Sequence, residues 1–431
     1  MSGPFSFFSR RNFLKASILG VAAASPLSRA MAAVPVTSKL VGTPSANSFT
    51  VAISAAAKVS SYIEYGYSKN SVAGKTTAIS ISAGSTTNIT ISGLKANSQV
   101  FYKVKYALGI SKNFASLTQK IVNTATAAQN AVFAIQADPH MDENSSADVY
   151  KGTLKQIVAA SPAFLMDLGD IFMVDKLADK SEANIRARYT LMQGYYKNIG
   201  DTPLKIVLGN HDGELGYSKF NTKSYRAEYF PQQTADLSYY SFVDNGVLHI
   251  ALDPFTFTTE NPKADGWQWT LGKTQYDWLK ATLEASDAKL KFVYIHHLLC
   301  MDAQSRGGVK IAGFNEWGGK NVDGTEGFAA KRPGWEMPVH QLLVKHKVAA
   351  VFKGHDHLYA KEELDGVVYQ TLPQPSHPGE ATNSAVQYGY GEAKVIGGSG
   401  YLRVTTAGST AKVDFVKFDG TLGDSYQISV S

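Results

Sequence analysis

The sequence predicts an α/β layered domain preceded by an all-β sandwich, and two changes of pattern predict this division. Between about Val34 and Thr126, short runs rich in Ser, Thr, Val and Ile alternate with turn residues, which is typical of a β-sandwich. After Thr126, apolar runs of strand length alternate with helical periods, which is typical of α/β folds. The 431 residues are 44% hydrophobic and 18% charged, as in a globular protein long enough for two domains.

The first 33 residues have the order of an export signal. Ser9–Lys15 contains adjacent arginines and resembles a twin-arginine signal, an apolar run follows at Ala16–Ala24, and Ala30-Met31-Ala32 is a cleavage site of the A-x-A type. The apolar run is too short to span a bilayer. We therefore expect a periplasmic or secreted protein, with the twin-arginine export machinery as a partner and no membrane span in the mature chain. An uncleaved anchor or a chance arginine pair is the alternative.

Charge and cysteine content exclude two classes of protein. The formal net charge is +6, but four cations and no acidic residue lie in the export signal, which leaves +2 on the mature chain. A nearly neutral chain gives no indication of a nucleic-acid-binding surface. The single cysteine, Cys300, excludes an intramolecular disulfide, and its position after an apolar strand indicates a buried, inert thiol.

Residues 34–127 are predicted to form the sandwich. Four of its strands are expected at 48–54, 61–67, 87–94 and 99–106. The turn at Gly93–Ser98, followed by Tyr102, resembles that of fibronectin type III domains, including the one that precedes the catalytic domain of purple acid phosphatases. Because no His, Cys or acidic cluster occurs here, we expect a structural or interaction module without chemistry.

Residues 128–431 are predicted to form the α/β domain. Its strands are expected at 131–136, 163–166, 204–208, 291–295 and 348–353, and its helices at 147–160, 274–285 and 339–346. Ser238–Ala251, with a turn at Asp244-Asn245-Gly246, is interpreted as a β-hairpin inserted into the domain. Two C-terminal strands, at 402–405 and 412–416, are expected to close the second sheet of the same domain.

Polar side chains follow five of the predicted strands, at the point where each strand ends. These endings are Asp138-Pro139-His140, Asp167-Leu168-Gly169-Asp170, Gly209-Asn210-His211-Asp212, His296-His297 and Gly354-His355-Asp356-His357. Sites in α/β sheets are built at the carboxyl ends of strands. One such ending is unremarkable, but a series of five is hard to explain by packing, so the sequence predicts a site at this edge.

This ordered set resembles the motifs of the calcineurin-like metallophosphoesterase superfamily over about residues 131–357. The resemblance implies a four-layer αββα domain and two divalent or mixed-valence metal ions, which we expect to be Fe, Zn or Mn because carboxylate and imidazole are their ligands. It implies one ion on Asp138, His140, Asp170 and His357, and a second on Asp170, Asn210, His296 and His355, with Asp170 bridging.

The resemblance also implies a reaction. A hydroxide between the metals is expected to attack the phosphorus of a small phosphate ester, while His211 protonates the leaving oxygen. Phosphomonoesters are the expected substrates. A phosphodiesterase using the same site is the nearest alternative, and a catalytically inactive cell-surface binding protein is an alternative of another class.

Two departures from the resemblance leave roles open. Purple acid phosphatases have a tyrosine ligand where this chain has Met173, and relatives that carry an aspartate there use it to orient the catalytic histidine. Asp175 and Asp212 are the candidate substitutes for that aspartate, and Asp212 is predicted to be catalytic with His211. His297, Arg306 and Arg332 are predicted substrate contacts. The segment Gln304–Trp335 is interpreted as either a substrate-shaping loop or a surface excursion.

Overall fold

The computed structural model describes residues 35–41, 44–124, 131–141, 144–171, 173–216, 219, 224–230, 238–258, 265–301 and 305–430. The predicted export signal, residues 1–33, and the predicted domain boundary at residues 127 and 128 lie outside the described residues. Within the described ranges, no helix has the length and apolar composition that crossing a membrane requires.

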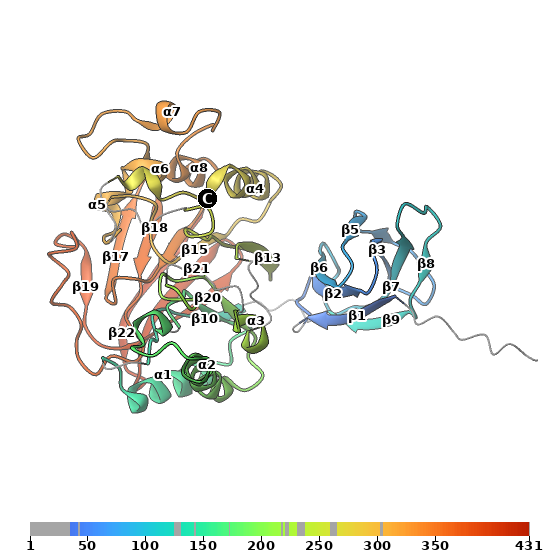
Figure 1. Cartoon of the computed structure of the whole chain (residues 1–431), viewed down its shortest axis with the longest axis horizontal. Coiled ribbons are helices and arrows are strands. Elements are labelled where there is room, and N and C mark those ends of the chain that lie inside the picture. Colours follow the sequence, from blue (N-terminus) through green and yellow to red (C-terminus); the bar gives the residue numbers. More distant parts are fainter. Residues whose placement is uncertain are drawn as a thin grey trace, which may run out of the picture.

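The N-terminal unit is a sandwich of two antiparallel sheets (Figure 1). One sheet has the order β1 (Val36–Val41), β2 (Phe49–Ala55) and β6 (Ser85–Ile91). The other is built on β3 (Val59–Gly66) and β7 (Gln99–Leu108), which pair with the short strands β4 (Gly74–Lys75), β5 (Ile79–Ile81), β8 (Ala115–Ser116) and β9 (Lys120–Asn123). Every second residue of β2 is buried, so this strand contributes one apolar face to the core.

The α/β unit contains two further sheets. The six-stranded sheet has the order β12 (Leu204–Ile206), β11 (Leu165–Asp167), β10 (Ala131–Gln136), β20 (Gly400–Ala407), β21 (Thr410–Lys417) and β22 (Leu422–Ser429). The seven-stranded sheet has the order β13 (Tyr240–Asp244), β14 (Val247–Ala251), β15 (Lys291–Ile295), β16 (Ala350–Lys353), β18 (Val367–Thr371), β17 (Tyr359–Leu364) and β19 (Lys394–Ile396).

The two sheets pack face to face and helices cover their outer faces, which confirms the four-layer αββα architecture. Phe133 and Phe415 of one sheet meet Phe292 and Phe352 of the other in a shared apolar core. Helices α1 (Ala147–Ala159) and α2 (Glu182–Tyr196) cover the six-stranded sheet, and α4 (Gly272–Glu284), α6 (Asn315–Gly318) and α8 (Val339–Lys345) cover the other (Figure 1). Three other short helices, α3 (Arg226–Tyr229), α5 (Val309–Ala312) and α7 (Phe328–Lys331), lie in connections.

Two segments differ from the sequence interpretation. The hairpin β13–β14 is not an insertion, because β14 pairs in parallel with β15 and makes the hairpin the edge of the seven-stranded sheet. Gln304 lies outside the described residues, but 305–335 is neither a loose excursion nor mainly a pocket wall. It folds into α5, α6 and α7, and its Trp317 is fully buried in the core beneath α4 and α8.

Candidate metal centre

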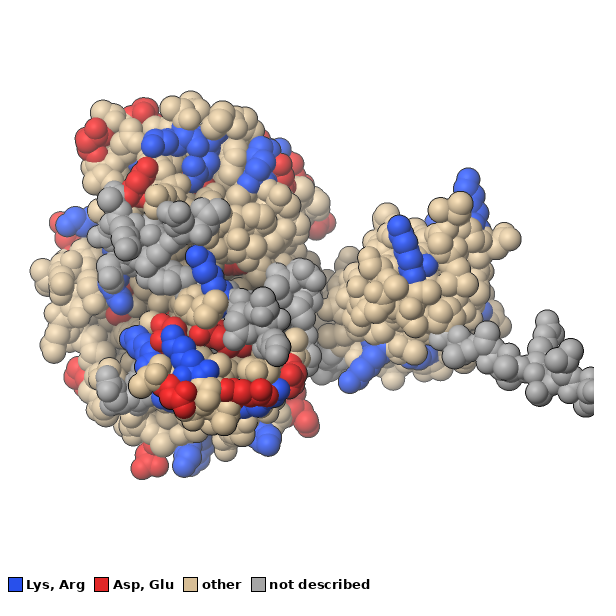
Figure 2. Space-filling view, in the orientation of Figure 1, with Lys and Arg blue, Asp and Glu red and all other residues tan. Residues whose placement is uncertain are grey.

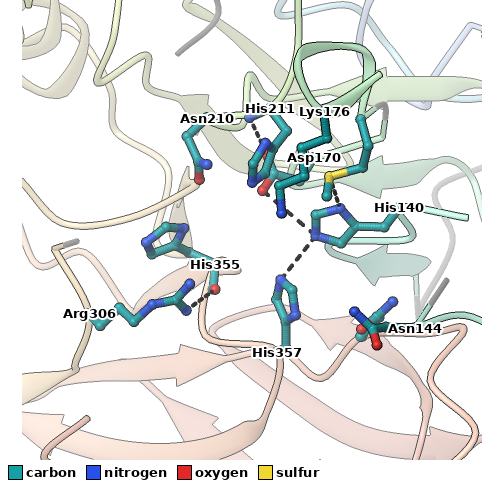
Figure 3. Close-up of a pocket in the computed structure, with 11 residues that line it drawn as sticks. His140, Asn144, Asp170, Lys176, Asn210, His211, Arg306, His355 and His357 are labelled. Carbon is teal, nitrogen blue, oxygen red and sulfur yellow. Dashed lines mark hydrogen bonds and ion pairs between the residues drawn. The ribbon is translucent and has the colours of Figure 1, made fainter. Parts of the chain in front are cut away.

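The two sheets bring the polar strand endings to one place. β10, β11 and β12 run in parallel in one sheet, and β14, β15, β16 and β18 run in parallel in the other. The loops after β10, β11, β12, β15 and β16 therefore meet at the carboxyl edge of both sheets. They surround a cavity lined by His140, Asn144, Asp170, Met173, Lys176, Asn210, His211, Arg306, His355, His357 and Gln374 (Figure 3).

One group of potential ligands consists of Asp138, His140, Asp170 and His357, whose nearest donor atoms all lie within 4.8 Å of one another. Nε2 of His140 lies 3.0 Å from Nε2 of His357 and 3.8 Å from Oδ2 of Asp170. Nδ1 of His140 faces the sulfur of Met173, so Nε2 is the nitrogen that points into the cavity (Figure 3). This is the first ligand set that the sequence predicted.

A second group consists of Asp170, His296 and His355, again with donor atoms within 4.8 Å. Nε2 of His296 lies 3.3 Å from Oδ2 of Asp170 and 3.0 Å from Oδ1 of Asn210, which brings the predicted amide ligand to the same group. Nδ1 of His296 faces the carbonyl oxygen of Leu168 at 2.9 Å, which fixes the ring orientation. Because Oδ2 of Asp170 faces His140 on one side and His296 on the other, this carboxylate belongs to both groups.

The residues fit a pair of metal ions. Oδ1 of Asp138 is buried without a hydrogen-bond partner among the described atoms, and it lies 3.4 Å from Nε2 of His357 and 3.9 Å from that of His296. An unpaired buried carboxylate oxygen is costly unless a cation binds it. Two carboxylates, one amide and four imidazoles are the donors that Zn, Fe or Mn take, and the shared Asp170 permits a dinuclear centre.

The electrostatics of the cluster agree with this assignment. Burial alone would raise the pKa of Asp138, but the imidazoles of His357 and His296 outweigh it and lower that pKa. Burial and the neighbouring His357 lower the pKa of His140 to about 4, so its ring is neutral. Anionic carboxylates beside a neutral imidazole are the protonation states that metal ligands need. Burial lowers the pKa of His296, but Asp170 and Asp138 outweigh it and raise that pKa to about 9, so a cation binding at this ring would displace a proton.

The glycines that precede the ligands are required by close approach. A Cβ at position 354 would overlap Oδ2 of Asp138, and this same oxygen accepts a hydrogen bond from the backbone N–H of His355 at 2.8 Å. A Cβ at position 209 would overlap the backbone nitrogen of Asp170. The ligand loops touch one another through bare backbone, so Gly354 and Gly209 set the spacing of the site.

His211 lies at the rim of the cavity and contacts a carboxylate. Its backbone N–H donates to Oδ1 of Asp170 at 2.7 Å, and its Nδ1 lies 3.0 Å from Oδ2 of Asp175. Burial lowers the pKa of His211, but Asp170 and Asp175 outweigh that effect and raise it overall. Of the two candidate orienting groups, Asp175 is therefore the one that contacts the ring.

Asp212 is positioned differently from its predicted catalytic role. It is fully buried, and its two oxygens accept hydrogen bonds from the backbone N–H groups of Asp170, Ile171 and Gly209 at 2.7–3.0 Å. These bonds tie the loop after β12 to the loop after β11. Asp212 faces backbone rather than the cavity, so the prediction of a catalytic carboxylate at this position is corrected to a loop-holding one.

The three residues predicted to contact substrate occupy different environments in the structure. Arg306 lines the cavity, where its guanidinium donates to the carbonyl oxygen of His355 at 2.6 Å (Figure 3). His297 is buried behind the site, with its ring centroid 4.4 Å from that of Trp269 and 5.1 Å from that of His355, so it supports a ligand instead of facing substrate.

Arg332 lies away from the cavity and contradicts its predicted role. Its guanidinium pairs with the buried Glu316 and donates to the carbonyl oxygen of Trp267 at 2.6 Å. The ring of Trp335 also lies 5.6 Å from the guanidinium carbon. Arg332 therefore holds the segment 305–335 together, because an arginine in a loop joins whichever buried carboxylate lies within its reach.

Sequence reasoning missed three cavity residues, namely Asn144, Lys176 and Gln374. Each lies in a connection without hydrophobic period, and none belongs to a motif, so only the tertiary structure places them. Cys300 is buried as predicted, and burial raises the pKa of its thiol.

Comparisons with known proteins show which family this chain resembles and which solved structures have a similar fold. A sequence model described as calcineurin-like phosphoesterase matches residues 131–359. A search of curated proteins found no match. Among solved structures, that of PhoD has 14% identity and a TM-score of 0.50, covering 92% of this chain and 88% of the other. GAP50, the anchor in the inner membrane complex of Plasmodium, has 14% identity and a TM-score of 0.48, covering 70% of this chain and 89% of the other.

Proposed function

The chain belongs to the calcineurin-like phosphoesterase family and is a phosphoesterase hydrolase, and from this premise we propose that it cleaves phosphomonoesters with a dinuclear metal centre. The observation that carries the proposal is the shared carboxylate of Asp170. One of its oxygens faces both ligand groups, and its other oxygen accepts the backbone N–H of the residue that we assign as the acid, His211.

The ligand residues would hold the two ions at the floor of the cavity. Asp138, His140 and His357 would complete one coordination set around Asp170, and Asn210, His296 and His355 the other. Such ions, when bound, neutralise the charge on phosphoryl oxygens and provide a nucleophile at neutral pH. The chain itself contributes the rigid spacing, through Gly354, Gly209 and the backbone bonds of Asp212.

His211 is assigned as the group that protonates the leaving oxygen. Its Nδ1 is held by Asp175, which leaves Nε2 as the atom that transfers the proton. The side chain of His211 is 19% exposed, so it reaches solvent from which the proton is renewed. Asp175 fixes the ring and stabilises its charged form, as the third member of a catalytic triad does.

The charge of the cavity favours a monoester. A phosphomonoester dianion carries one more negative charge than a diester, so Arg306 and bound metal cations would attract it more strongly. A phosphoryl group would contact Arg306 beside His355, and the guanidinium is held in place by Asp356 at 3.4 Å. A diester would need room for a second ester group beside that arginine.

Kinetics on matched substrates test the proposal. We expect turnover of 4-nitrophenyl phosphate to exceed that of bis(4-nitrophenyl) phosphate by at least tenfold, with about two bound metal ions per chain by elemental analysis. His211→Ala should keep the metal but lose about a hundredfold in kcat on an alkyl phosphate, whose leaving group needs the proton, and less on 4-nitrophenyl phosphate. An equal loss on both esters would contradict the role of His211, and a preference for the diester would contradict the substrate class.

We also propose export through the twin-arginine pathway, on the basis of the order of residues in the first 33 positions. Replacing Arg10 and Arg11 together by lysine should leave the full-length precursor in the cytoplasmic fraction. Unchanged processing and export of that double variant would refute this part of the proposal.

A further inference from the structure

Lys176 is a cavity residue with no function assigned so far. It is exposed, and the described residues include no hydrogen-bond or ion-pair partner for its ammonium group. It lies in a 3₁₀ turn, Val174–Lys176, directly after the Asp175 that contacts His211. Figure 3 shows its side chain extending from beside His211 over the cavity.

The cavity carries positive charge on two opposite sides. Lys176 lies on the side of His211, and Arg306 lies on the side of His355 (Figure 3). The only carboxylate among the described lining residues is Asp170, which is a metal ligand. Metal ions on the floor would add further positive charge, so nothing on the described walls neutralises Lys176.

The two cations differ in how firmly they are held. Arg306 donates to the carbonyl oxygen of His355 at 2.6 Å, lies 3.4 Å from Oδ1 of Asp356, and stacks 4.8 Å from the ring centroid of Tyr388. This fixes Arg306 next to one ligand group, where the phosphoryl group would bind. Lys176 has no such anchor, and its long flexible side chain suits a group whose position varies between substrates.

The side on which Lys176 lies is the side of the leaving group, because His211 delivers the proton to the leaving oxygen. Resting on the proposed phosphomonoesterase function, we propose that Lys176 binds a second anionic group, a carboxylate or a further phosphate, carried by the leaving group of the substrate. The substrate class is thus small phosphomonoesters with a second negative charge a few bonds from the scissile ester.

The remaining walls agree with a polar leaving group. Asn144 and Gln374 place amide groups on the cavity beside His140 and His357, and Met173 supplies the one aliphatic side chain of the described lining. An aromatic or lipid leaving group would find no apolar surface there, whereas a hydroxylated, charged one would find hydrogen-bond partners.

Two matched substrate pairs test this inference. 3-Phosphoglycerate and glycerol 3-phosphate differ in a carboxylate against a hydroxymethyl group, and fructose 1,6-bisphosphate and fructose 6-phosphate differ in a second phosphate. We expect kcat/KM of the metal-loaded protein to favour the more highly charged member of at least one pair by about twofold to fivefold at low salt, because an ion pair at an exposed site is of that strength. The pair that shows the preference identifies carboxylate or phosphate as the second group.

Two lysine variants distinguish a specific contact with Lys176 from a general effect of positive charge. In Lys176→Met the preference should fall to about one, whereas Lys180→Met, which removes the same charge from an exposed residue of the following segment, should keep it. The preference should also shrink as ionic strength rises. A ratio near one for both pairs in the unaltered protein, or an unchanged ratio in Lys176→Met, would overturn the inference.

Binding measurements keep this inference distinct from the proposed function. Calorimetric dissociation constants for the same pairs, measured on the slow His211→Ala variant, should show the same preference and the same loss on adding Lys176→Met. Turnover of all four esters without a charge preference would overturn the inference and leave the function standing. A charge preference in binding without turnover of any ester would overturn the proposed function and leave the anion-binding role of Lys176 standing.

Discussion

The sandwich and the metal-binding end of the α/β domain differ in which residues have left-handed backbone and in which polar side chains are buried. In the sandwich, the non-glycine residues with left-handed backbone are Asn70 and Asn97, which are turn asparagines, and the buried polar side chains are Ser48, Ser61 and Thr124 among the described residues. At the metal-binding end, five predicted ligands have left-handed backbone, namely Asp138, His140, Asp170, His355 and His357.

The difference shows which interactions determine the conformation of each region. Alternating apolar side chains form the core of the sandwich, and its buried polar side chains are small hydroxyls. The metal-binding end instead buries carboxylates and imidazoles on strained loops, each strained residue costing about 1 to 3 kcal/mol. Such loops persist only because the two packed sheets and the motif glycines leave them no alternative. Variants that affect one region and not the other sharpen this contrast.

The largest expected effect is that of Asp170→Asn, which removes the carboxylate shared by both ligand groups. We expect kcat to fall by about a thousandfold or more together with loss of bound metal, because an amide does not supply the bridging charge. Elemental analysis and steady-state kinetics measure both. Asp424→Asn, a buried carboxylate at the far edge of the six-stranded sheet, serves as the control that should keep metal and activity. Full activity of Asp170→Asn with stoichiometric metal would contradict the assignment.

The next effect concerns pH and Asp167, which lies beneath the loop that carries Asp170. Burial raises its pKa to about 7, in spite of hydrogen bonds from Gln136 at 2.6 Å and Tyr196 at 2.7 Å. The folded state therefore binds a proton that the unfolded state has released, so this group's contribution to stability is present below about pH 4 and is lost as pH rises to 7. The stability of Asp167→Asn relative to the unaltered protein should rise over that interval by about 3 to 4 kcal/mol.

Tryptophan fluorescence can follow this change in the α/β domain alone, because Trp267, Trp269, Trp278, Trp317 and Trp335 all lie there. Urea unfolding at pH 4.5 and pH 8 gives the two differences in stability. A difference that does not vary with pH would mean that Asp167 is ionised in the folded state throughout.

Ile53→Ala tests the other side of the comparison, since Ile53 is fully buried in the core of the sandwich. The cavity should destabilise the sandwich by about 3 kcal/mol. Far-UV circular dichroism should show earlier unfolding of the sandwich, while the tryptophan transition and the bound metal stay unchanged. Loss of metal from this variant would show that the sandwich supports the site.

Gly354→Ala should disturb the site without removing any ligand. The added Cβ overlaps Oδ2 of Asp138, so we expect weaker metal binding and about a hundredfold lower activity. The matched control is Gly194→Ala in α2, where a Cβ meets nothing within 4 Å and should stabilise the helix by about 0.5 to 1 kcal/mol. Metal titrations of both variants decide whether the close approach at position 354 matters.

The smallest expected effect is that of Asp175→Asn, which keeps a hydrogen-bond acceptor near His211 but removes the charge. We expect a loss of about tenfold in kcat on alkyl phosphates, with metal content unchanged. The loss should be smaller on 4-nitrophenyl phosphate, whose leaving group needs no proton. A loss of the same size on both esters would assign Asp175 a structural role only.

The fold and the convergence of the candidate ligands were predictable from the sequence because local and tertiary signals coincide there. β10 and β15 follow the predicted ranges because apolar runs of strand length end at polar motifs. Helix α2 was missed because its buried face consists of Ile185, Tyr189, Met192 and Tyr196, in which tyrosine hides the helical period.

Contacts between segments distant in sequence were less predictable. Nothing in the order of residues separates Asp175 from Asp212, because both lie near a motif, and the choice depends on which loop faces His211. From the sequence alone, Arg306 and Arg332 are equally plausible anion-binding residues. Only the fold shows that Arg332 pairs with Glu316 and that Arg306 lines the cavity.

The left-handed backbone at the ligands also sets a limit on how this protein can change. Glycine or asparagine tolerates that conformation better than histidine does, so a lineage that no longer needed the metals would gain stability by replacing His357, whose side chain is partly exposed. Selection for robustness alone would thus erode the centre one residue at a time. Bound metal would offset this strain, so removing the metals should cost the loops at Asp138, His140, Asp170, His355 and His357 more stability than the rest of the domain.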